Sequence, residues 1–356
     1  MRGGEKVLEA ICDLYPDATL FTLVRAPGSV SERIERHPIE TSFVQKLPAP
    51  ARFYRHYLPL YPTAVELLDL DRFDLVISSS HCAVKSVIRR GDARHVCYCH
   101  SPMRYAWDQF DAYFGEAQVG KWRNRILRPV MAGLARWDAA TAGRPDRFLA
   151  NSQYVAGRIR RYYNRRSTVV YPPVDTDYFR PEAPSPSVPG ALIVSALVPY
   201  KRIGLAIEAC RSARLPLKIV GRGPEEARLR LLAGDTNVEF LGWRTDEEIR
   251  QLYRTASVVL LPGTEDFGIV PVEAQACGTP VVALAAGGAC ETVIDGETGA
   301  LVPVPDAHAF ADAIRGVVDG RLDRAVIRRN AERFSVDAFK RSFETAVHET
   351  MVSAAP

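Results

Sequence analysis

Three absences narrow the class of protein before any motif is considered. The chain has no Cys-x-x-Cys spacing, and its seven cysteines are an odd number, which argues against a disulfide framework and against a zinc site. No apolar run approaches the roughly 20 residues that a membrane-spanning helix needs, and no acidic cluster has the spacing of a divalent-metal site. We therefore expect a cytoplasmic protein with reduced thiols and no metal.

The composition is otherwise that of a globular protein, and its charge is uneven along the chain. With 356 residues, 47% hydrophobic and 25% charged, the sequence is long enough for two domains and too apolar for a disordered chain. Residues 1–180 contain 27 Lys and Arg against 19 Asp and Glu, whereas residues 181–356 contain 19 against 23. The basic first half favours an anionic partner there, either a phosphate-bearing acceptor or a membrane surface.

Short apolar runs alternate with helical periodicity along the chain, which is typical of parallel α/β sheets covered by helices. In the first half we predict strands at 18–24, 74–79, 95–99, 147–150 and 168–171, and helices at 5–14 and 121–142. In the second half we predict strands at 191–195, 217–220, 238–240, 257–261 and 280–284, separated by helices near 202–213, 224–233, 245–255 and 269–277.

The α/β pattern predicts two Rossmann-like, doubly wound domains. The first covers 1–178, a linker with four prolines lies within 179–190, and the second covers 191–332. Two such domains face each other across a cleft, and the carboxyl ends of their strands bind ligands there.

The start of the chain departs from this pattern. Doubly wound domains normally open with a strand, but this sequence opens with a Gly3-Gly4 turn that leads directly into a helix. We therefore expect the first strand to be missing, the first sheet to be interrupted, and the working protein to carry a longer N-terminus.

The strongest chemical signal is the segment from Glu265 to Glu273, which follows a predicted strand. Pro271 suits the first turn of a helix, so Glu265 lies in the loop before that helix and Glu273 within its first turn. The unpaired amides at Gly268 and Ile269 can bind a diphosphate, while the two carboxylates can bind sugar and ribose hydroxyls. Two acids that merely favour the helix dipole are the alternative, but the strand and helix context favours a nucleotide-sugar site.

A second signal is the pair Lys201-Arg202, just after the strand at 191–195. Two cations at the mouth of a parallel sheet can neutralise a diphosphate leaving group without a metal. A solvated helix start is the alternative, although cations disfavour that end of a helix. Gly221 and Gly223 end the next strand and would let a ligand approach the backbone closely, but many strand–helix turns look like this.

Two further features lie in the first half. His100 ends an apolar strand, where it can hydrogen-bond a donor sugar or orient an acceptor; a buried structural histidine is the alternative. Cations and tryptophans share the helical stretch 121–137, which is typical of an interfacial membrane element. A surface helix packed on the first domain is the alternative.

Together these motifs resemble the family 4 retaining glycosyltransferases of GT-B fold, over nearly the whole chain. Ser195–Ile203 and Glu265–Cys277 are most similar to the O-antigen mannosyltransferase branch. The resemblance implies transfer of mannose from GDP-mannose with retention, no cofactor or metal, and a glycan or polyprenyl-diphosphate-linked acceptor in cell-surface polysaccharide synthesis. It also implies a C-terminal helix within 333–356 that packs on the first domain. From the basic first half and the stretch 121–137 we expect a peripheral contact with the inner face of the plasma membrane, and we expect no nucleic-acid partner.

The resemblance assigns a role to each candidate residue. Four are implied to act on the reacting groups, and the others to bind the donor or begin the wall between the domains. Lys201 and Arg202 would hold the diphosphate, Glu265 the sugar hydroxyls and Glu273 the ribose, while His100 would lie at the donor sugar. The amides of Phe267, Gly268 and Ile269 would meet phosphate or sugar, Gly3 and Gly4 would face the donor phosphate, and Gly221 and Gly223 would let the donor approach the backbone. Asn151 and Ser152 would begin the wall between the domains.

Other classes stay open at this point. A dinucleotide-dependent oxidoreductase needs a third glycine after Gly221 and Gly223, where this chain has Ala227 or Arg228. A nucleotide-sugar epimerase or hydrolase of the same fold would lack the basic helix, and an inactive sugar-nucleotide-binding protein is supported only by the missing strand. We expect a hexosyltransferase.

Overall fold

The computed structural model describes residues 3–115, 119–182, 190–320 and 322–353. The chain divides into two compact units, of which unit 1 comprises Met1–Pro173 with Phe339–Pro356, and unit 2 comprises Val174–Ala338. No helix in the described ranges is both long and apolar enough to cross a membrane.

The break between the units falls a few residues before the predicted domain end at 178. Val174 already pairs with Ser335, and Phe179 packs edge-on against Tyr253, so these residues belong to unit 2. Of the predicted linker 179–190, residues 183–189 lie outside the described part of the chain.

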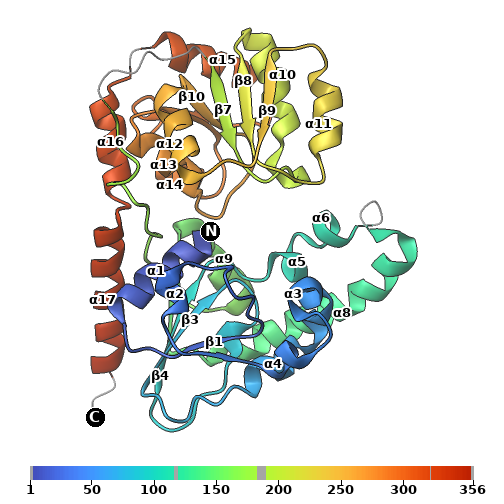
Figure 1. Cartoon of the computed structure of the whole chain (residues 1–356), viewed down its shortest axis with the longest axis vertical. Coiled ribbons are helices and arrows are strands. Elements are labelled where there is room, and N and C mark those ends of the chain that lie inside the picture. The colour runs from blue at the N-terminus through green and yellow to red at the C-terminus, as the bar shows by residue number, and fades with distance from the viewer. Residues whose placement is uncertain (1–2, 116–118, 183–189, 321, 354–356) are drawn as a thin grey trace. The chain divides into compact units, whose positions relative to one another are not determined.

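Unit 2 is a six-stranded parallel sheet with helices on both sides (Figure 1). The strands lie in the order β12-β11-β10-β7-β8-β9. The elements are β7 (Ala191–Val194), η5 (Pro199–Lys201), α10 (Ile203–Ala213), β8 (Leu217–Val220), α11 (Glu226–Ala233), β9 (Val238–Gly242), α12 (Asp246–Thr255), β10 (Val258–Leu261), α13 (Ile269–Ala276), β11 (Val281–Leu284), α14 (Ala289–Thr292), β12 (Gly299–Val302), α15 (Ala307–Asp319) and α16 (Arg324–Glu332).

The order of these strands reverses between β7 and β10. From β7 the chain proceeds outward through β8 and β9, and then returns to the other side of β7 and proceeds through β10, β11 and β12. Such a reversal is the place where open α/β sheets bind ligands, beyond the carboxyl ends of the strands. The fold alone therefore points to the loops that follow β7 and β10.

Both faces of this sheet are covered, which explains why its strands read as continuous apolar runs. In β10, Val258 and Leu260 pack into one core with α10, α11 and α15, while Val259 and Leu261 are also buried and point to the opposite face. The same alternation holds in β7 and β11.

The described strands of unit 1 form two parallel sheets, so the expectation of an interrupted first sheet is confirmed. Four strands lie in the order β3-β4-β5-β6, while β1 pairs only with β2. The elements are α1 (Gly3–Leu14), β1 (Leu20–Thr22), α2 (Glu32–Glu35), β2 (Ile39–Thr41), η1 (Phe43–Lys46), α3 (Pro50–Phe53), η2 (Tyr54–Leu60), α4 (Tyr61–Glu66), β3 (Leu75–Ser80), η3 (Val84–Ser86), β4 (Arg94–Cys99), α5 (Arg104–Trp107), α6 (Phe110–Phe114), α8 (Lys121–Ala140), η4 (Thr141–Gly143), β5 (Arg147–Ala150), α9 (Gln153–Tyr163), β6 (Ser167–Val169) and α17 (Val336–Val352).

The four-stranded sheet is covered on one face by α1 and α17 and on the other by α9. Tyr98 and Leu149 share a core with the apolar residues of α1 and α17, whereas Cys97 and Phe148 share a second core with α9. Lys340 of α17 also pairs with Asp13 of α1 at 2.9 Å. The C-terminal helix thus completes the core of unit 1 from Phe339 onward.

Two sequence predictions about unit 1 are wrong. The Gly3-Gly4 segment is not a turn, because α1 already begins at Gly3. Strand β2 was also not predicted. None of its three residues is buried, so the sequence shows no apolar run there.

Candidate functional site

The loops at the strand reversal of unit 2 bring two of the predicted residues into direct contact. Lys201 ends η5 after β7, Glu265 follows β10, and the Lys201 ammonium forms an ion pair with the Glu265 carboxylate. Each side chain is only 16% exposed. A hydrogen-bond donor with positive charge and an acceptor with negative charge therefore lie together at the place where open α/β sheets bind ligands.

Glycines bring these loops close to one another. A Cβ on Gly263 would lie 2.6 Å from the Tyr200 carbonyl oxygen and 2.8 Å from the Lys201 Cα, so only glycine allows the two loops to approach this closely. Gly221 has a φ of +131°, and its Cβ would lie 1.8 Å from the Ser195 carbonyl oxygen. The close packing of loop against loop positions the backbone around Lys201.

Gly223 belongs to the same packing. Its Cβ would lie 2.3 Å from the Leu197 carbonyl oxygen. The structural role of Gly221 and Gly223 is thus a close approach between backbones, and their predicted approach to a ligand stays a prediction.

A second pair of glycines holds the loop that carries Glu265. The Gly288 amide donates to the Glu265 carbonyl oxygen at 2.9 Å, and Gly287 pairs with Glu265 in an isolated parallel bridge. A Cβ on Gly288 would lie 2.3 Å from the Phe267 Cα. The Gly287-Gly288 segment therefore packs directly against the backbone from Glu265 to Phe267 and holds it in place.

Replacing Gly288 with alanine is expected to lower the free energy of unfolding by about 1–3 kcal/mol, because the added methyl group overlaps backbone that cannot move easily. Gly316 in α15 is the matched control, since nothing lies within 4 Å of the position of its Cβ. Gly316→Ala should stabilise the helix by about 0.5–1 kcal/mol. Urea denaturation of both variants measures the difference; equal stabilities would show that the loop is not held as described.

The loop leads into α13, whose N-terminus the sequence predicted as an anion site. Gly268 is the N-cap with a φ of +87°, a left-handed conformation that favours glycine, and Ile269 is the first helical residue. Phe267 is 3% exposed and packs edge-on against Phe334, 5.4 Å between ring centres. The side chain of Phe267 is therefore part of the core, and only its backbone can meet a ligand.

Glu273 lies deeper than the sequence predicted. It is the fifth residue of α13 rather than part of the first turn, it is 8% exposed, and it accepts a hydrogen bond from the Tyr253 hydroxyl at 3.1 Å. Burial and the Glu273 carboxylate raise the pKa of Tyr253 well above its usual value, so the phenol stays a donor. Tyr253 orients this carboxylate, and no motif in the sequence pointed to this tyrosine.

Arg202 differs from its neighbour. It is exposed and adopts a left-handed backbone with a φ of +52° as the N-cap of α10. This conformation costs a non-glycine residue roughly 1–2 kcal/mol, and such outliers gather at functional sites. Ala49, Asn164 and Arg214 share this backbone conformation outside the site, so the contact of Arg202 with the diphosphate stays a prediction.

The remaining candidates lie in unit 1, around His100 at the end of β4. The His100 amide donates to the Ser80 carbonyl oxygen at 2.7 Å, and its Nε2 lies 2.8 Å from the Ser79 hydroxyl oxygen. Gly4, beside Gly3 in the first turn of α1, lies against the ring, because its Cβ would be 3.6 Å from the His100 Cε1. The structure thus places Gly3, Gly4 and His100 together within unit 1. Ser152 caps α9, and Asn151 precedes it.

Burial makes His100 a neutral ring. It lowers the pKa of His100 from 6.5 to about 3, with a smaller contribution from His81. The Nε2 of His95 lies 2.8 Å from the Ser78 hydroxyl oxygen. The pKa of His95 is likewise lowered to about 3, mainly by burial and to a smaller extent by the charge of Arg89. At neutral pH the His100 imidazole has one N–H donor and one acceptor nitrogen, and it is not in the imidazolium form that acts as a general acid.

Acidification is expected to destabilise the protein through these two rings. Their folded pKa values lie below 6.5, so between about pH 6.5 and 3 the unfolded chain binds protons that the folded chain does not. Stability is full above pH 6.5 and falls as the pH drops, by up to about 1.4 kcal/mol per pH unit for each ring. Urea denaturation of His100→Gln at pH values between 7 and 5 should show a smaller loss of stability per pH unit than urea denaturation of the wild type. An unchanged slope in His100→Gln would contradict this assignment.

Within the described residues, no group of three or more His, Cys, Asp or Glu side chains could hold a metal ion. The residues that sequence reasoning missed are mainly glycines and buried aromatics around the two loops. The only sequence signal for the glycines was their place in the loop after a strand: Gly263 lies two residues beyond the end of β10, and Gly287-Gly288 begins three residues beyond the end of β11.

Comparison with known proteins is consistent with this geometry. Residues 2–178 match the family described as Glycosyltransferase Family 4, and residues 175–334 match Glycosyl transferases group 1. A D-inositol 3-phosphate glycosyltransferase of Mycolicibacterium smegmatis is 35% identical over 236 residues, 57% of this chain and 54% of that protein. The chain spans about half the length of the curated relatives it matches.

Solved structures show the same fold. Anabaena HepE in complex with UDP superposes with a TM-score of 0.70 at 21% identity, over 98% of this chain and 96% of HepE. Sucrose-phosphate synthase from Thermosynechococcus elongatus gives 0.71 at 20% identity, over 98% and 92%. The predicted GT-B architecture of two Rossmann-like domains is confirmed. Because the two family matches follow one another from residue 2 to 334, the chain belongs to the family 4 glycosyltransferases of GT-B fold.

Proposed function

We propose that this protein transfers a hexose from a nucleoside diphosphate-sugar to an acceptor hydroxyl group. The observation that carries the proposal is the Lys201–Glu265 pair at the strand reversal of unit 2. A nucleoside diphosphate-sugar has phosphates that need cations and sugar hydroxyls that need acceptors, and the pair supplies one of each.

In the proposed reaction the bond from the sugar C1 to the diphosphate breaks, and the leaving group gains negative charge. Lys201, Arg202 and the amides at the start of α13 would stabilise that charge. The acceptor oxygen forms the new bond to C1, and its proton passes to the departing phosphate. Glu265 would hold the sugar hydroxyls, and Glu273, oriented by Tyr253, would hold the ribose.

The finer parts of the proposal rest on the sequence resemblance. They are mannose from GDP-mannose as the donor, retention of the anomeric configuration, a lipid-linked glycan as the acceptor and a role in cell-surface polysaccharide synthesis. The same resemblance proposes a hydrogen bond from the neutral His100 ring to the donor sugar. The Mycolicibacterium relative is named for inositol 3-phosphate, and HepE was solved with UDP-glucose, so both belong in the test.

Donor binding tests the proposal directly. The melting temperature should be measured with a panel of GDP- and UDP-hexoses, with and without EDTA. A ligand at 100 times its Kd adds about 2.7 kcal/mol of stability, so one sugar nucleotide should raise the melting temperature and EDTA should leave that rise intact. No rise with any sugar nucleotide would refute the donor site, whereas a rise that EDTA abolishes would refute the metal-independent mechanism.

A further inference from the structure

Two serine–histidine pairs lie on opposite faces of the four-stranded sheet of unit 1. Ser78 and Ser79 are neighbours in β3, so their side chains point to opposite faces. The Ser78 hydroxyl oxygen lies 2.8 Å from Nε2 of His95, and the Ser79 hydroxyl oxygen lies 2.8 Å from Nε2 of His100. The two pairs are alike in this contact, but they differ in the surroundings of the second ring nitrogen, Nδ1.

The Nδ1 of His95 is enclosed by the core. The residue is 0% exposed, and this nitrogen has no hydrogen-bond partner among the described residues. Buried N–H groups without an acceptor are rare in proteins, because each one costs its full desolvation energy. The His95 ring is therefore expected to carry its hydrogen on Nε2 and to donate it to Ser78.

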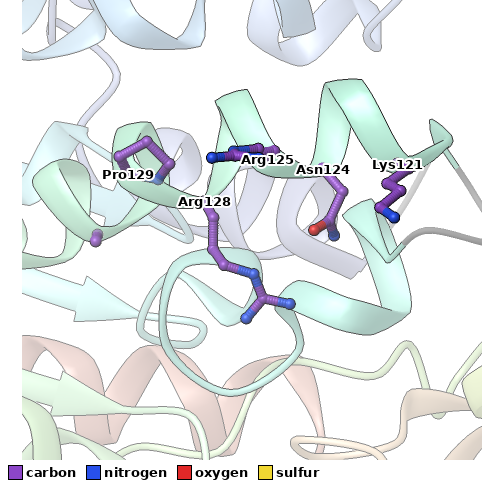
Figure 2. A pocket seen from close by; sticks show the side chains of 6 residues that line it. Lys121, Asn124, Arg125, Arg128 and Pro129 are labelled. Atoms are coloured by element: carbon purple, nitrogen blue, oxygen red, sulfur yellow. The ribbon is translucent and has the colours of Figure 1, made fainter.

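The Nδ1 of His100 is open. Within the described ranges no hydrogen bond reaches this nitrogen, and it is not one of the enclosed polar atoms. The ring is held from other sides, because Tyr98 packs edge-on at 5.1 Å between ring centres and a Cβ on Gly4 would lie 3.7 Å from Nε2. Nδ1 is thus the nitrogen that a ligand can reach. The groove of about 490 Å³ along α8 is a separate hollow, since its lining residues all lie on that helix (Figure 2).

The Ser79 hydroxyl group determines which nitrogen of His100 carries the hydrogen. A serine hydroxyl can rotate to donate or to accept, and a bare imidazole nitrogen is a more basic acceptor than an alcohol oxygen. The direction from the Ser79 O–H to Nε2 is therefore favoured. Because a neutral imidazole has one N–H and one bare nitrogen, its hydrogen must then lie on Nδ1. Free histidine in water prefers the opposite form, with the hydrogen on Nε2, so the serine changes the state of the ring.

We propose that Ser79 is a positioning residue for His100, which it holds with Nε2 as an acceptor so that Nδ1–H faces the ligand as a hydrogen-bond donor. The ligand contact rests on the proposed glycosyl transfer, in which an oxygen atom of the donor sugar accepts this hydrogen bond. The other form of the ring would offer a lone pair at Nδ1 and would select a hydroxyl hydrogen instead. Ser79 thereby sets which kind of ligand atom His100 recognises.

Nitrogen-15 NMR of the histidine rings in the full chain tests the form of the ring without any substrate, because N–H and bare ring nitrogens resonate far apart. At neutral pH the wild type should carry the hydrogen on Nδ1 of His100. Ser79→Ala should shift this ring toward the Nε2–H form, and Ser79→Thr should keep the wild-type form. Ser78→Ala, which removes the matching hydroxyl group from the other face, is the control and should leave the His100 signals unchanged. Hydrogen on Nε2 in the wild type, or unchanged signals in Ser79→Ala, would overturn the proposal.

Kinetics with the sugar nucleotide that binds test the ligand contact. Ser79→Ala should lower kcat/KM by about three- to tenfold, the worth of one neutral hydrogen bond, while Ser79→Thr retains activity. The amide nitrogen of asparagine overlies Nδ1 and that of glutamine overlies Nε2, so His100→Asn should be about fivefold or more as active as His100→Gln. Equal activity of these two variants, or an unchanged kcat/KM in Ser79→Ala, would overturn the ligand contact. An inactive wild type with the expected NMR signals would refute glycosyl transfer and support the role of Ser79 in holding the ring.

Discussion

Replacing Lys201 with alanine is expected to lower kcat/KM by about 10²–10³. The ammonium group would stabilise the diphosphate as it gains charge, and a charge-assisted hydrogen bond is worth about 1.5–3 kcal/mol, with more when it strengthens in the transition state. Initial rates at saturating acceptor measure the effect. Lys218→Thr, which removes an exposed lysine from β8 of the same unit, is the control and should retain activity. Activity of Lys201→Ala within twofold of the wild type would remove Lys201 from the site.

A swapped pair separates this role from simple structural support. Lys201→Glu combined with Glu265→Lys restores an ion pair between the two loops, so a structural role predicts recovery of both stability and activity. The proposed role predicts recovery of stability alone, because the cation and the carboxylate would then face the wrong parts of the donor. Recovery of activity in the swapped variant would contradict the assignment.

Breaking the buried ion pair of unit 1 should have the largest effect on stability. The Lys85 ammonium lies 3.0 Å from the Asp138 carboxylate, and both side chains are almost completely inaccessible. Lys85 also donates to the Asp138 carbonyl oxygen, while the Asp138 carboxylate accepts from the Trp107 and Tyr163 side chains at 2.8 Å. Lys85→Met should lower the free energy of unfolding by about 3–5 kcal/mol, because it leaves a buried carboxylate without its cation.

Two comparisons make this prediction specific. Removing both charges, with Lys85→Met and Asp138→Asn, should cost less than Lys85→Met alone. The exposed pair of Arg90 and Asp71, 2.9 Å apart, should contribute only about 0–1 kcal/mol. Urea denaturation of Lys85→Met, of the double variant and of Arg90→Met measures the three free energies of unfolding. A loss below 1 kcal/mol for Lys85→Met would show that the pair does not hold unit 1 together.

The sheet of unit 2 could be predicted from the sequence for a physical reason. Its strands β7, β10 and β11 are covered on both faces, so each one reads as a short apolar run in the sequence. The predicted strand at 217–220 matches β8, and that at 280–284 differs from β11 by one residue. The positions of Lys201 and Glu265 could be predicted for the same reason, because Lys201 lies in the loop after β7 and Glu265 in the loop after β10.

The rest of the site depends on contacts between segments far apart in the sequence. The closeness of Gly288 to the Phe267 backbone and the bond from Tyr253 to Glu273 arise only when the elements pack together. A buried lysine such as Lys85 likewise looks like any surface lysine in the sequence. Local patterns report burial and turns, but they do not report which distant backbone a glycine must approach.

The central claim is tested most directly by following a sugar nucleotide and an acceptor together in one reaction. The donor identified by melting temperature would be incubated with lipid-linked glycan or inositol 3-phosphate acceptors, and all products would be identified by mass spectrometry. The account predicts one hexosyl unit on the acceptor for each nucleoside diphosphate released by the wild type, and almost none by Glu265→Gln. Free hexose alone, an epimerised sugar nucleotide, or donor binding without turnover on any acceptor would contradict it.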